Sequence, residues 1–207
     1  MTTADLPYGP TMSALLEPLR RGFRVLNRYV AGPMIRVGAG PLLCTPLSGS
    51  ILVLRTVGRK SGLVREAPLG YAVVDGRVAM IAGYGRDAHW FRNALANPTV
   101  QIALPGAVFA GTAEELTDGV ARREAFRAVM AALGTVGQLT LGDVGEMSDE
   151  EIDHFADAFP VLAVTPTAVL PGPYDPGGVF TKVNLWLWAG VAATGALALT
   201  RRRRDCC

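Results

Sequence analysis

Short runs of β-forming residues alternate with tight turns through the middle of the chain, and this alternation constrains the fold more than any other feature. The predicted strands are Ile51–Val57, Val64–Val74, Arg77–Ala82, Thr99–Leu104, Ala107–Leu116 and Phe159–Thr165. Asp75-Gly76 is a strong hairpin signal, and Pro68 predicts an edge position or a bulge in the second run. Because the connections are short, the pattern favours an antiparallel sheet or small barrel over a doubly wound parallel sheet.

Helical segments frame this β-rich region. Helices are predicted over Met12–Val30, Ala88–Asn97 and Val120–Leu133, and a further helix is predicted to begin after the capping residue Ser148. In the first helix, apolar residues share one face and arginines lie opposite, so it is basic and amphipathic. It either packs on its own domain or lies on anionic lipid, and the sequence leaves both readings open.

The C-terminal region has the composition of a linker followed by a membrane helix. Prolines and glycines recur through residues 167–182. Val183–Thr200 contains no charged residue, and as a helix it would span ~27 Å, close to the hydrocarbon core of a bilayer. Trp186 and Trp188 near its start and arginines at 201–204 after its end are typical of interfacial anchors. The alternative is a terminal helix docked on the barrel or on a dimer partner.

These signals divide the 207 residues into five segments. They are residues 1–40 with the amphipathic helix, 41–166 with the barrel, 167–182 as linker, 183–200 as membrane helix and 201–207 as basic tail. The terminal arginines place the C-terminus in the cytoplasm, which for a spanning helix puts the barrel outside. The lack of a secretory signal and of a disulfide framework favours a cytoplasmic barrel, so the topology of the tail stays open.

The charge distribution and the absence of several known motifs restrict the classes of function that the sequence allows. The net charge is only +2, but basic residues dominate the front of the chain and acidic residues dominate from Glu114 to Asp157. This asymmetry predicts an anionic partner such as lipid headgroups, phosphate or a polycarboxylate. Motifs for nucleic-acid binding are lacking, and His89 and His154 lack neighbours at metal-ligand spacing. Signatures of hydrolases are absent too, which favours redox chemistry with a bound cofactor.

The stretch from Thr56 to Pro98 carries the most specific motifs. It contains Thr56-Val57-Gly58-Arg59-Lys60-Ser61-Gly62, then Arg65, Pro68-Leu69, Asp75-Gly76 and Trp90-Phe91-Arg92-Asn93-Ala94-Leu95-Ala96-Asn97-Pro98. In order and spacing these motifs resemble the nitroreductase family of deazaflavin-dependent oxidoreductases, which use coenzyme F420. The resemblance covers roughly residues 20–166 and implies a mainly β (α+β), FMN-binding-like split β-barrel that holds the cofactor in a groove.

The resemblance also implies a set of cofactor-binding residues, with FMN as the alternative cofactor. They are Gly58, Arg59, Lys60, Ser61, Gly62, Arg65, Pro68, Gly83, Gly85, Trp90 and Asn93. The tail of coenzyme F420, a phosphodiester followed by glutamates, is strongly anionic, so Lys60 and Arg65 can bind it by charge-assisted hydrogen bonds. Backbone N–H groups of the turn are expected to add an anion nest. Trp90 is more often a core residue, and Asn93 can bond either backbone or cofactor.

The expected reaction is hydride transfer from the reduced deazaflavin to an acceptor stacked on its ring. Tyr84 and Tyr71 are candidate proton donors, and either can equally be a packing residue. Attachment to the cytoplasmic face of the cell membrane by the C-terminal helix favours a lipophilic acceptor such as a quinone, with a nitro compound as the other candidate. A non-catalytic carrier of cofactor or lipid and a structural membrane protein are the alternatives. A homodimer also stays open.

Overall fold

The computed structural model describes residues 49–104, 106–135, 143–171 and 182–191, together with residues 30, 33, 34, 39, 42 and 137. Within this part of the chain, seven strands form one antiparallel sheet. They are β1 (Ile51–Val57), β2 (Val64–Gly70), β3 (Ala72–Val74), β4 (Arg77–Ile81), β5 (Thr99–Leu104), β6 (Ala107–Glu115) and β7 (Val161–Leu170). The helices packed on the sheet are α3 (His89–Ala96), α4 (Gly119–Ala132) and α6 (Asp149–Ala158), and the 3-10 helix η4 (Gly85–Asp87) precedes α3.

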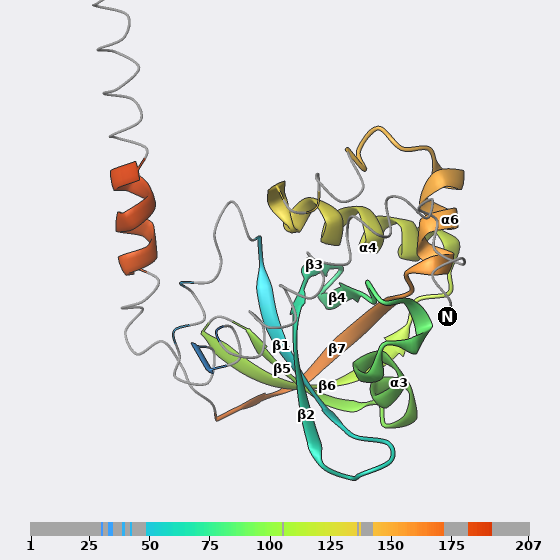
Figure 1. The fold of residues 1–207 in the computed structure, drawn as a ribbon, viewed down its shortest axis with the longest axis horizontal. Helices are drawn as coiled ribbons and strands as arrows, with labels where there is room; N and C mark the ends of the chain where they lie inside the picture. The colour runs from blue at the N-terminus through green and yellow to red at the C-terminus, as the bar shows by residue number, and fades with distance from the viewer. Residues whose placement is uncertain are drawn as a thin grey trace, which may run out of the picture.

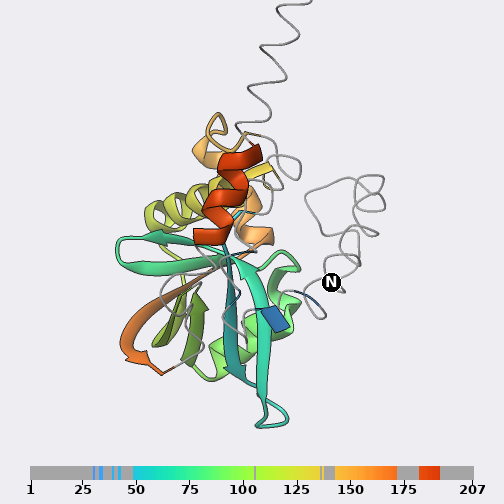
Figure 2. The ribbon, with the colours of Figure 1, turned by 90° about the vertical axis from the view of Figure 1, so that its left-hand side faces the viewer.

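The sheet curls because its two edges are adjacent in the chain. The strand order is β2-β1-β5-β6-β7-β4-β3. The strands at the two edges, β2 and β3, follow one another with only Tyr71 between them, so the sheet has to bend until its edges approach. β2 accordingly packs against β4, and Figures 1 and 2 show the strands curled around a common interior. The prediction of a mainly β protein built on an antiparallel sheet is therefore confirmed, and the curl of the sheet is consistent with the predicted split β-barrel.

Alternation along the strands divides the apolar side chains between two cores. Leu52 and Leu54 of β1 pack with Phe91 of α3 on the face inside the curl, here called the inner face. Ala79 of β4 points to the opposite face and packs with Phe126 of α4 and with residues of α6. α3 therefore covers one side of the sheet, while α4 and α6 together cover the other, as Figure 1 shows.

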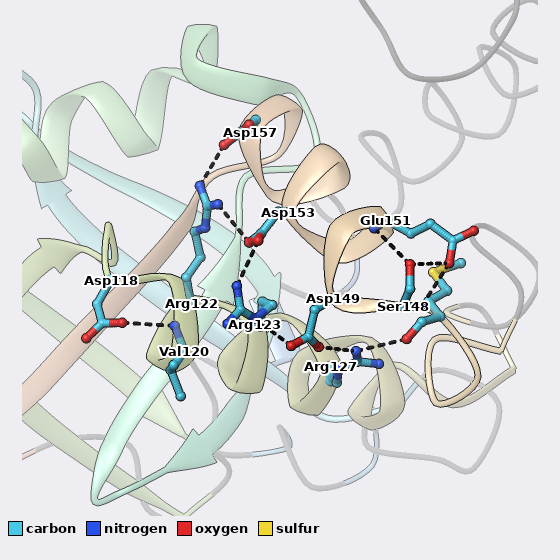
Figure 3. A network of polar contacts seen from close by, with 11 residues as sticks. Asp118, Val120, Arg122, Arg123, Arg127, Ser148, Asp149, Glu151, Asp153 and Asp157 are labelled. Carbon is cyan, nitrogen blue, oxygen red and sulfur yellow. Dashed lines mark hydrogen bonds and ion pairs between the residues drawn. The ribbon is translucent and has the colours of Figure 1, made fainter.

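A set of alternating charges, here called the α4–α6 ladder, joins these two helices. Arg122 and Arg123 of α4 both donate to the Asp153 carboxylate of α6 at 2.8 Å, and Arg127 donates to Asp149 at 2.9 Å. Figure 3 shows the arginines of one helix facing the aspartates of the other. The hydrogen bond from Arg122, aided by that from Arg123, holds the pKa of Asp153 below its ordinary value.

The start of α6 confirms the prediction made for Ser148. Its hydroxyl accepts a hydrogen bond from the Glu151 N–H at 3.3 Å, and the Glu151 carboxylate accepts one from the Ser148 N–H at 2.8 Å. This capping box satisfies two backbone groups at the helix start. The Ser148 N–H lowers the pKa of Glu151, because it stabilises the ionised carboxylate.

Two predicted boundaries were wrong. The run Val64–Val74, predicted as one strand, divides at Tyr71 into β2 and β3. The edge position predicted for Pro68 is confirmed, because β2 is an edge strand of the sheet, where a residue without an N–H is tolerated. β7 continues to Leu170, so residues 167–170 are strand rather than linker. Pro166 pairs with Gly111 and the next pair is Ala110 with Ala168, so β7 continues past the proline through a bulge at its own residue Thr167. This bulge absorbs the proline and lets pairing continue.

The predicted terminal helices are only partly within the described residues. Residues 182–191 form a helix, drawn red in Figure 1, which stands apart from the barrel. Among the helices that the structure describes, none combines the length and the apolar character that crossing a bilayer requires. The remainder of the predicted membrane helix (192–200), the basic tail (201–207) and almost all of the amphipathic helix Met12–Val30 lie outside the described residues.

Candidate functional site

The turn between β1 and β2 is closed by its own backbone. The Gly58 N–H donates to the Leu63 carbonyl at 2.8 Å, and the Ser61 and Gly62 N–H groups donate to the Gly58 carbonyl at 3.1 and 2.8 Å. A Cβ atom on Gly58 would lie 2.7 Å from the Ser61 Oγ, and Gly62 has a φ of +66°. The left-handed backbone at Gly62 therefore favours glycine, and a side chain at Gly58 would have to displace the Ser61 hydroxyl. Because these N–H groups are used within the turn, they form no open anion nest, and side chains must supply the contacts to a ligand.

Strand register decides which side chains share a face of this hairpin. Arg65 pairs with Thr56, and Thr56 is on the same face of β1 as Leu52 and Leu54, so Arg65 belongs to the inner face next to α3. Pro68 pairs with Val53, which packs in a separate buried cluster on the opposite face. The hairpin thus brings Arg65 towards the basic turn and directs Pro68 away from it.

Asn93 of α3 connects the helix to the turn. Its Oδ1 accepts hydrogen bonds from the Arg59 backbone N–H at 3.2 Å and from the Arg59 Nη1 at 2.9 Å. Only 5% of Asn93 is exposed, whereas Lys60, Ser61 and Arg65 are exposed around it. The side chain of Ser61 also lies 3.5 Å from the Arg65 guanidinium, within reach of a weak hydrogen bond. Five of the predicted residues, Gly58 to Gly62, therefore meet Arg65 and Asn93 in one place.

The cations of this turn differ from the other arginines that the structure describes. Arginines elsewhere in these residues pair with carboxylates: Arg55 with Glu66, Arg77 with Glu114, Arg86 with Glu115, Arg92 with Asp87, and the three ladder arginines with aspartates. No carboxylate of the described residues pairs with Arg59, Lys60 or Arg65. Within the described residues no carboxylate offsets their charge, which makes this turn a candidate site for an anion.

Thr56 is a site residue to which the sequence analysis assigned no role of its own. It is 2% exposed, and its Oγ1 has no hydrogen-bond partner within the described part of the chain. It lies opposite Arg65 on the inner face. A buried hydroxyl without a partner is unfavourable, so a ligand oxygen in this position would gain a hydrogen bond. Thr56 follows Leu52 and Leu54 at alternate positions of β1, and this spacing is the sequence signal that could have identified it.

The second group of predicted residues lies at the beginning of α3. Gly83 and Tyr84 are exposed and Gly85 is buried, and η4 leads directly into the helix. Arg86 donates two hydrogen bonds to the Glu115 carboxylate at the end of β6, which fixes the loop and raises the pKa of Arg86. Asn93 is four residues after the first residue of α3, about 6 Å along the axis. The loop and the basic turn therefore flank one short helix.

Trp90 and Tyr71 are placed by packing. Trp90 is partly buried against the inner core and makes an edge-to-face contact with Phe91, with ring centroids 5.8 Å apart. Tyr71 also packs against this core, at the end of β2 that is far from the basic turn. Along a strand, seven residues from Val64 to Tyr71 correspond to ~23 Å. Tyr71 is therefore separated from the cationic turn by the length of the hairpin.

Comparison with known proteins identifies the relatives of this arrangement. The model of the F420H(2)-dependent quinone reductase family matches residues 33–136, about half of the chain. Among solved structures, the chain is similar to an F420-H2 dependent reductase (FDR-A), with 27% identity, a TM-score of 0.39, and coverage of 56% of this chain and 93% of that chain.

The chain is similar to two further solved structures at lower identity. An F420 reductase has 18% identity, a TM-score of 0.36, and coverage of 60% of this chain and 92% of that chain. General Stress Protein 26 from Bacillus anthracis has 10% identity, a TM-score of 0.40, and coverage of 66% and 95%. These structural scores are low, and the match to the family model carries the assignment.

Proposed function

The chain belongs to the family of F420H(2)-dependent quinone reductases, and from that membership we propose that it delivers a hydride to a small lipophilic acceptor at a membrane surface. It is an F420-dependent oxidoreductase. When bound, the reduced coenzyme supplies the hydride from its deazaflavin ring. The protein has to bind the anionic tail, orient the ring and exclude water from the reacting atoms.

The uncompensated charge of the basic turn is the observation that carries this proposal. Arg59, Lys60 and Arg65 have no carboxylate partner in the described residues, and the hydroxyls of Ser61 and Thr56 lie beside them. This set consists of cations and hydroxyls, which suits the phosphodiester and carboxylates of the F420 tail. Residues that already form ion pairs would have to break them before they could bind the same ligand.

The loop at the start of α3 is the proposed place for the ring. With the tail at Arg59 and Arg65, a cofactor laid along α3 reaches Gly83 and Tyr84 next. Tyr84 is 44% exposed and can approach a bound acceptor, so it is the proposed proton donor to the reduced product. Tyr71 is the other candidate for this role. We rank it second because it packs on the core, at the end of the hairpin away from the turn.

The helix at residues 182–191 supports a lipophilic acceptor and attachment to the membrane. Its exposed large apolar side chains are Val183, Leu185, Trp186, Leu187 and Val191, whereas Asn184 and Trp188 are half-buried. Exposed apolar side chains are stabilised when other apolar groups surround them, and lipid provides such surroundings. We therefore place the enzyme on the cytoplasmic face of the cell membrane. Deletion of residues 183–207 is expected to release the protein from membranes, and continued sedimentation would refute this attachment.

Titration with F420, followed by the fluorescence of the coenzyme, tests the site. The double substitution Lys60→Ala and Arg65→Ala is expected to raise the Kd about 100-fold, since each lost charge-assisted contact costs about tenfold. Arg77→Ala is the matched control, because Arg77 is a cation already paired with Glu114. An unchanged Kd in the double variant would mean that the tail binds elsewhere.

Stopped-flow oxidation of the reduced coenzyme by menaquinone tests the reaction. The wild-type protein is expected to accelerate the oxidation above the rate in solution, and Tyr84→Phe is expected to slow turnover while leaving the F420 Kd unchanged. Tight binding without any acceleration would identify the protein as a carrier of the coenzyme and overturn the proposed reaction with quinones.

A further inference from the structure

Asn93 holds Arg59 in a way that none of the other described arginines is held. One oxygen, the Asn93 Oδ1, accepts both the backbone N–H and the guanidinium Nη1 of Arg59. The two hydrogen bonds fold the side chain of Arg59 back over its own backbone and against α3. Both the position of the turn and the direction of the guanidinium therefore depend on one amide.

Because the partner of Arg59 is an amide and not a carboxylate, the positive charge of its guanidinium is not offset. In the described residues outside the basic turn, each arginine forms an ion pair with a carboxylate, which positions the guanidinium but also offsets its charge. An amide oxygen accepts the same hydrogen bonds and carries no net charge. Arg59 is thus ordered like the paired arginines and yet keeps its full positive charge.

Asn93 itself is poorly placed to touch a ligand. It is 5% exposed, and its Oδ1 is occupied by the two Arg59 donors. An effect of Asn93 on an anionic ligand has to pass through Arg59. Flexible arginines lose side-chain entropy when they bind, and an arginine that is already ordered loses less.

We propose that Asn93 is a positioning residue that holds Arg59 as an ordered, uncompensated cation for the anionic tail of the coenzyme. The inference rests on the proposed location of the tail at the basic turn. It assigns α3 a role in affinity that is separate from its packing in the core. It also explains why an asparagine is useful at a buried position where an aspartate would make a stronger pair with Arg59.

Asn93→Asp tests this proposal most directly. The carboxylate can accept the same two hydrogen bonds, so the melting temperature is expected to stay at or above the wild-type value. The new ion pair cancels the charge of Arg59, so the F420 Kd is expected to rise about tenfold and to depend less on salt concentration. A change in salt dependence is a readout that a role in folding alone would not produce.

A double-mutant cycle supplies the second test. Asn93→Ala and Arg59→Ala are each expected to raise the Kd several-fold, and the combined variant is expected to bind no more weakly than Arg59→Ala alone. Asn97→Ala, at the end of the same helix, is the control and is expected to bind normally. Additive losses in the cycle would show that Asn93 does not act through Arg59 and would overturn the proposal.

The outcome also separates this inference from the proposed function. If Lys60→Ala with Arg65→Ala weakens binding while Asn93→Asp binds F420 like the wild type, the positioning role is wrong and the site stands. If neither change alters the Kd, the tail does not bind at the turn, and both proposals fail.

Discussion

The arginines of the α4–α6 ladder and those of the β1–β2 turn share a side chain but not an electrostatic environment. Arg122, Arg123 and Arg127 each face one or more aspartates of α6, and Figure 3 shows these charges alternating across the interface. Arg59 is held by an amide, and Arg65 lies beside a hydroxyl. The ladder uses its cations to join two helices, whereas the turn keeps its cations available for a ligand.

This difference indicates how structural and functional charges can be distinguished in one protein. A cation whose partner is an anion of the same chain already has a favourable interaction, and binding a second anion adds little. Cations without such partners repel one another, so they do not stabilise the fold. An anionic ligand relieves this repulsion when it binds. The turn is therefore expected to respond mainly in affinity to substitutions, and the ladder mainly in stability.

Among the single substitutions, placing a carboxylate in the turn should have the largest effect. Leu63 is 60% exposed between the basic turn and Arg65, so Leu63→Glu would give the cations the type of partner that the ladder arginines have. The F420 Kd is expected to rise about 30-fold, which corresponds to about 2 kcal/mol. Fluorescence titration measures it, with Leu63→Gln as the uncharged control. Equal Kd values for the two variants would show that the charge of the turn does not determine F420 affinity, and the proposed difference between turn and ladder would be wrong.

Removing a cation from the ladder should change stability instead. Arg122 pairs with Asp153 and Asp157, and its side chain is 18% exposed. Arg122→Ala is expected to lower the free energy of unfolding by about 1–2 kcal/mol, because partly buried, doubly paired guanidinium groups contribute more than exposed ones. Urea unfolding measures this loss, and F420 binding should be unchanged. Weaker F420 binding by the Arg122→Ala variant, measured without urea where the variant is fully folded, would show that the two regions are coupled.

Two glycines in hairpin turns allow backbone strain to be separated from ligand binding. Gly62 and Gly76 have φ values of +66° and +74°, and a Cβ on either would meet no atom within 4 Å. Alanine at either position is therefore expected to cost about 1 kcal/mol of stability through the left-handed backbone alone. Only Gly62→Ala should also weaken F420 binding, by a few-fold. Thermal unfolding and titration of both variants, side by side, check this expectation.

Acid should remove stability that the α4–α6 ladder and the cap of α6 provide, whereas the basic turn should contribute nothing to this loss. We expect this effect to be the smallest. The folded-state pKa values of Asp153 and Glu151 lie below their ordinary values. The unfolded chain therefore binds more protons near pH 4, and the stabilisation is present above that pH and lost as the pH falls through the folded values. Urea unfolding from pH 7 to 3 measures the effect. The free energy of unfolding should fall less for Asp153→Asn than for the wild type, whereas Arg65→Ala should follow the wild type.

Local signals in the sequence were sufficient for the elements and their turns. Asp75-Gly76 predicted a hairpin, and the two residues adopt the positive φ values, 50° and 74°, that such a turn requires. Ser148 predicted a helix start, and it forms a capping box with Glu151. Pro166 was misleading as a strand end, because a bulge at the next residue, Thr167, lets β7 go on pairing with β6 as far as Leu170.

The basic turn was also visible in the sequence, but its partners were not. The glycines, cations and spacing around Gly58–Gly62 predicted an anionic cofactor, and the family match supports that reading. The sequence did not reveal that Pro68 faces away, that the hydroxyl of Thr56 lacks a partner, or that Asn93 binds Arg59. Each of these depends on strand register or on the docking of α3, which residue patterns do not specify.

By itself, the sequence determined where the chain turns, which segments form strands and helices, and where positive charge gathers, because a few neighbouring residues control backbone conformation. Only the tertiary structure decided which of those charges remain uncompensated. Arg59 and Asn93 are 34 residues apart, and they meet because α3 packs on the inner face of the curled sheet. Contacts between distant segments arise from the closure of the whole sheet, so no local pattern encodes them.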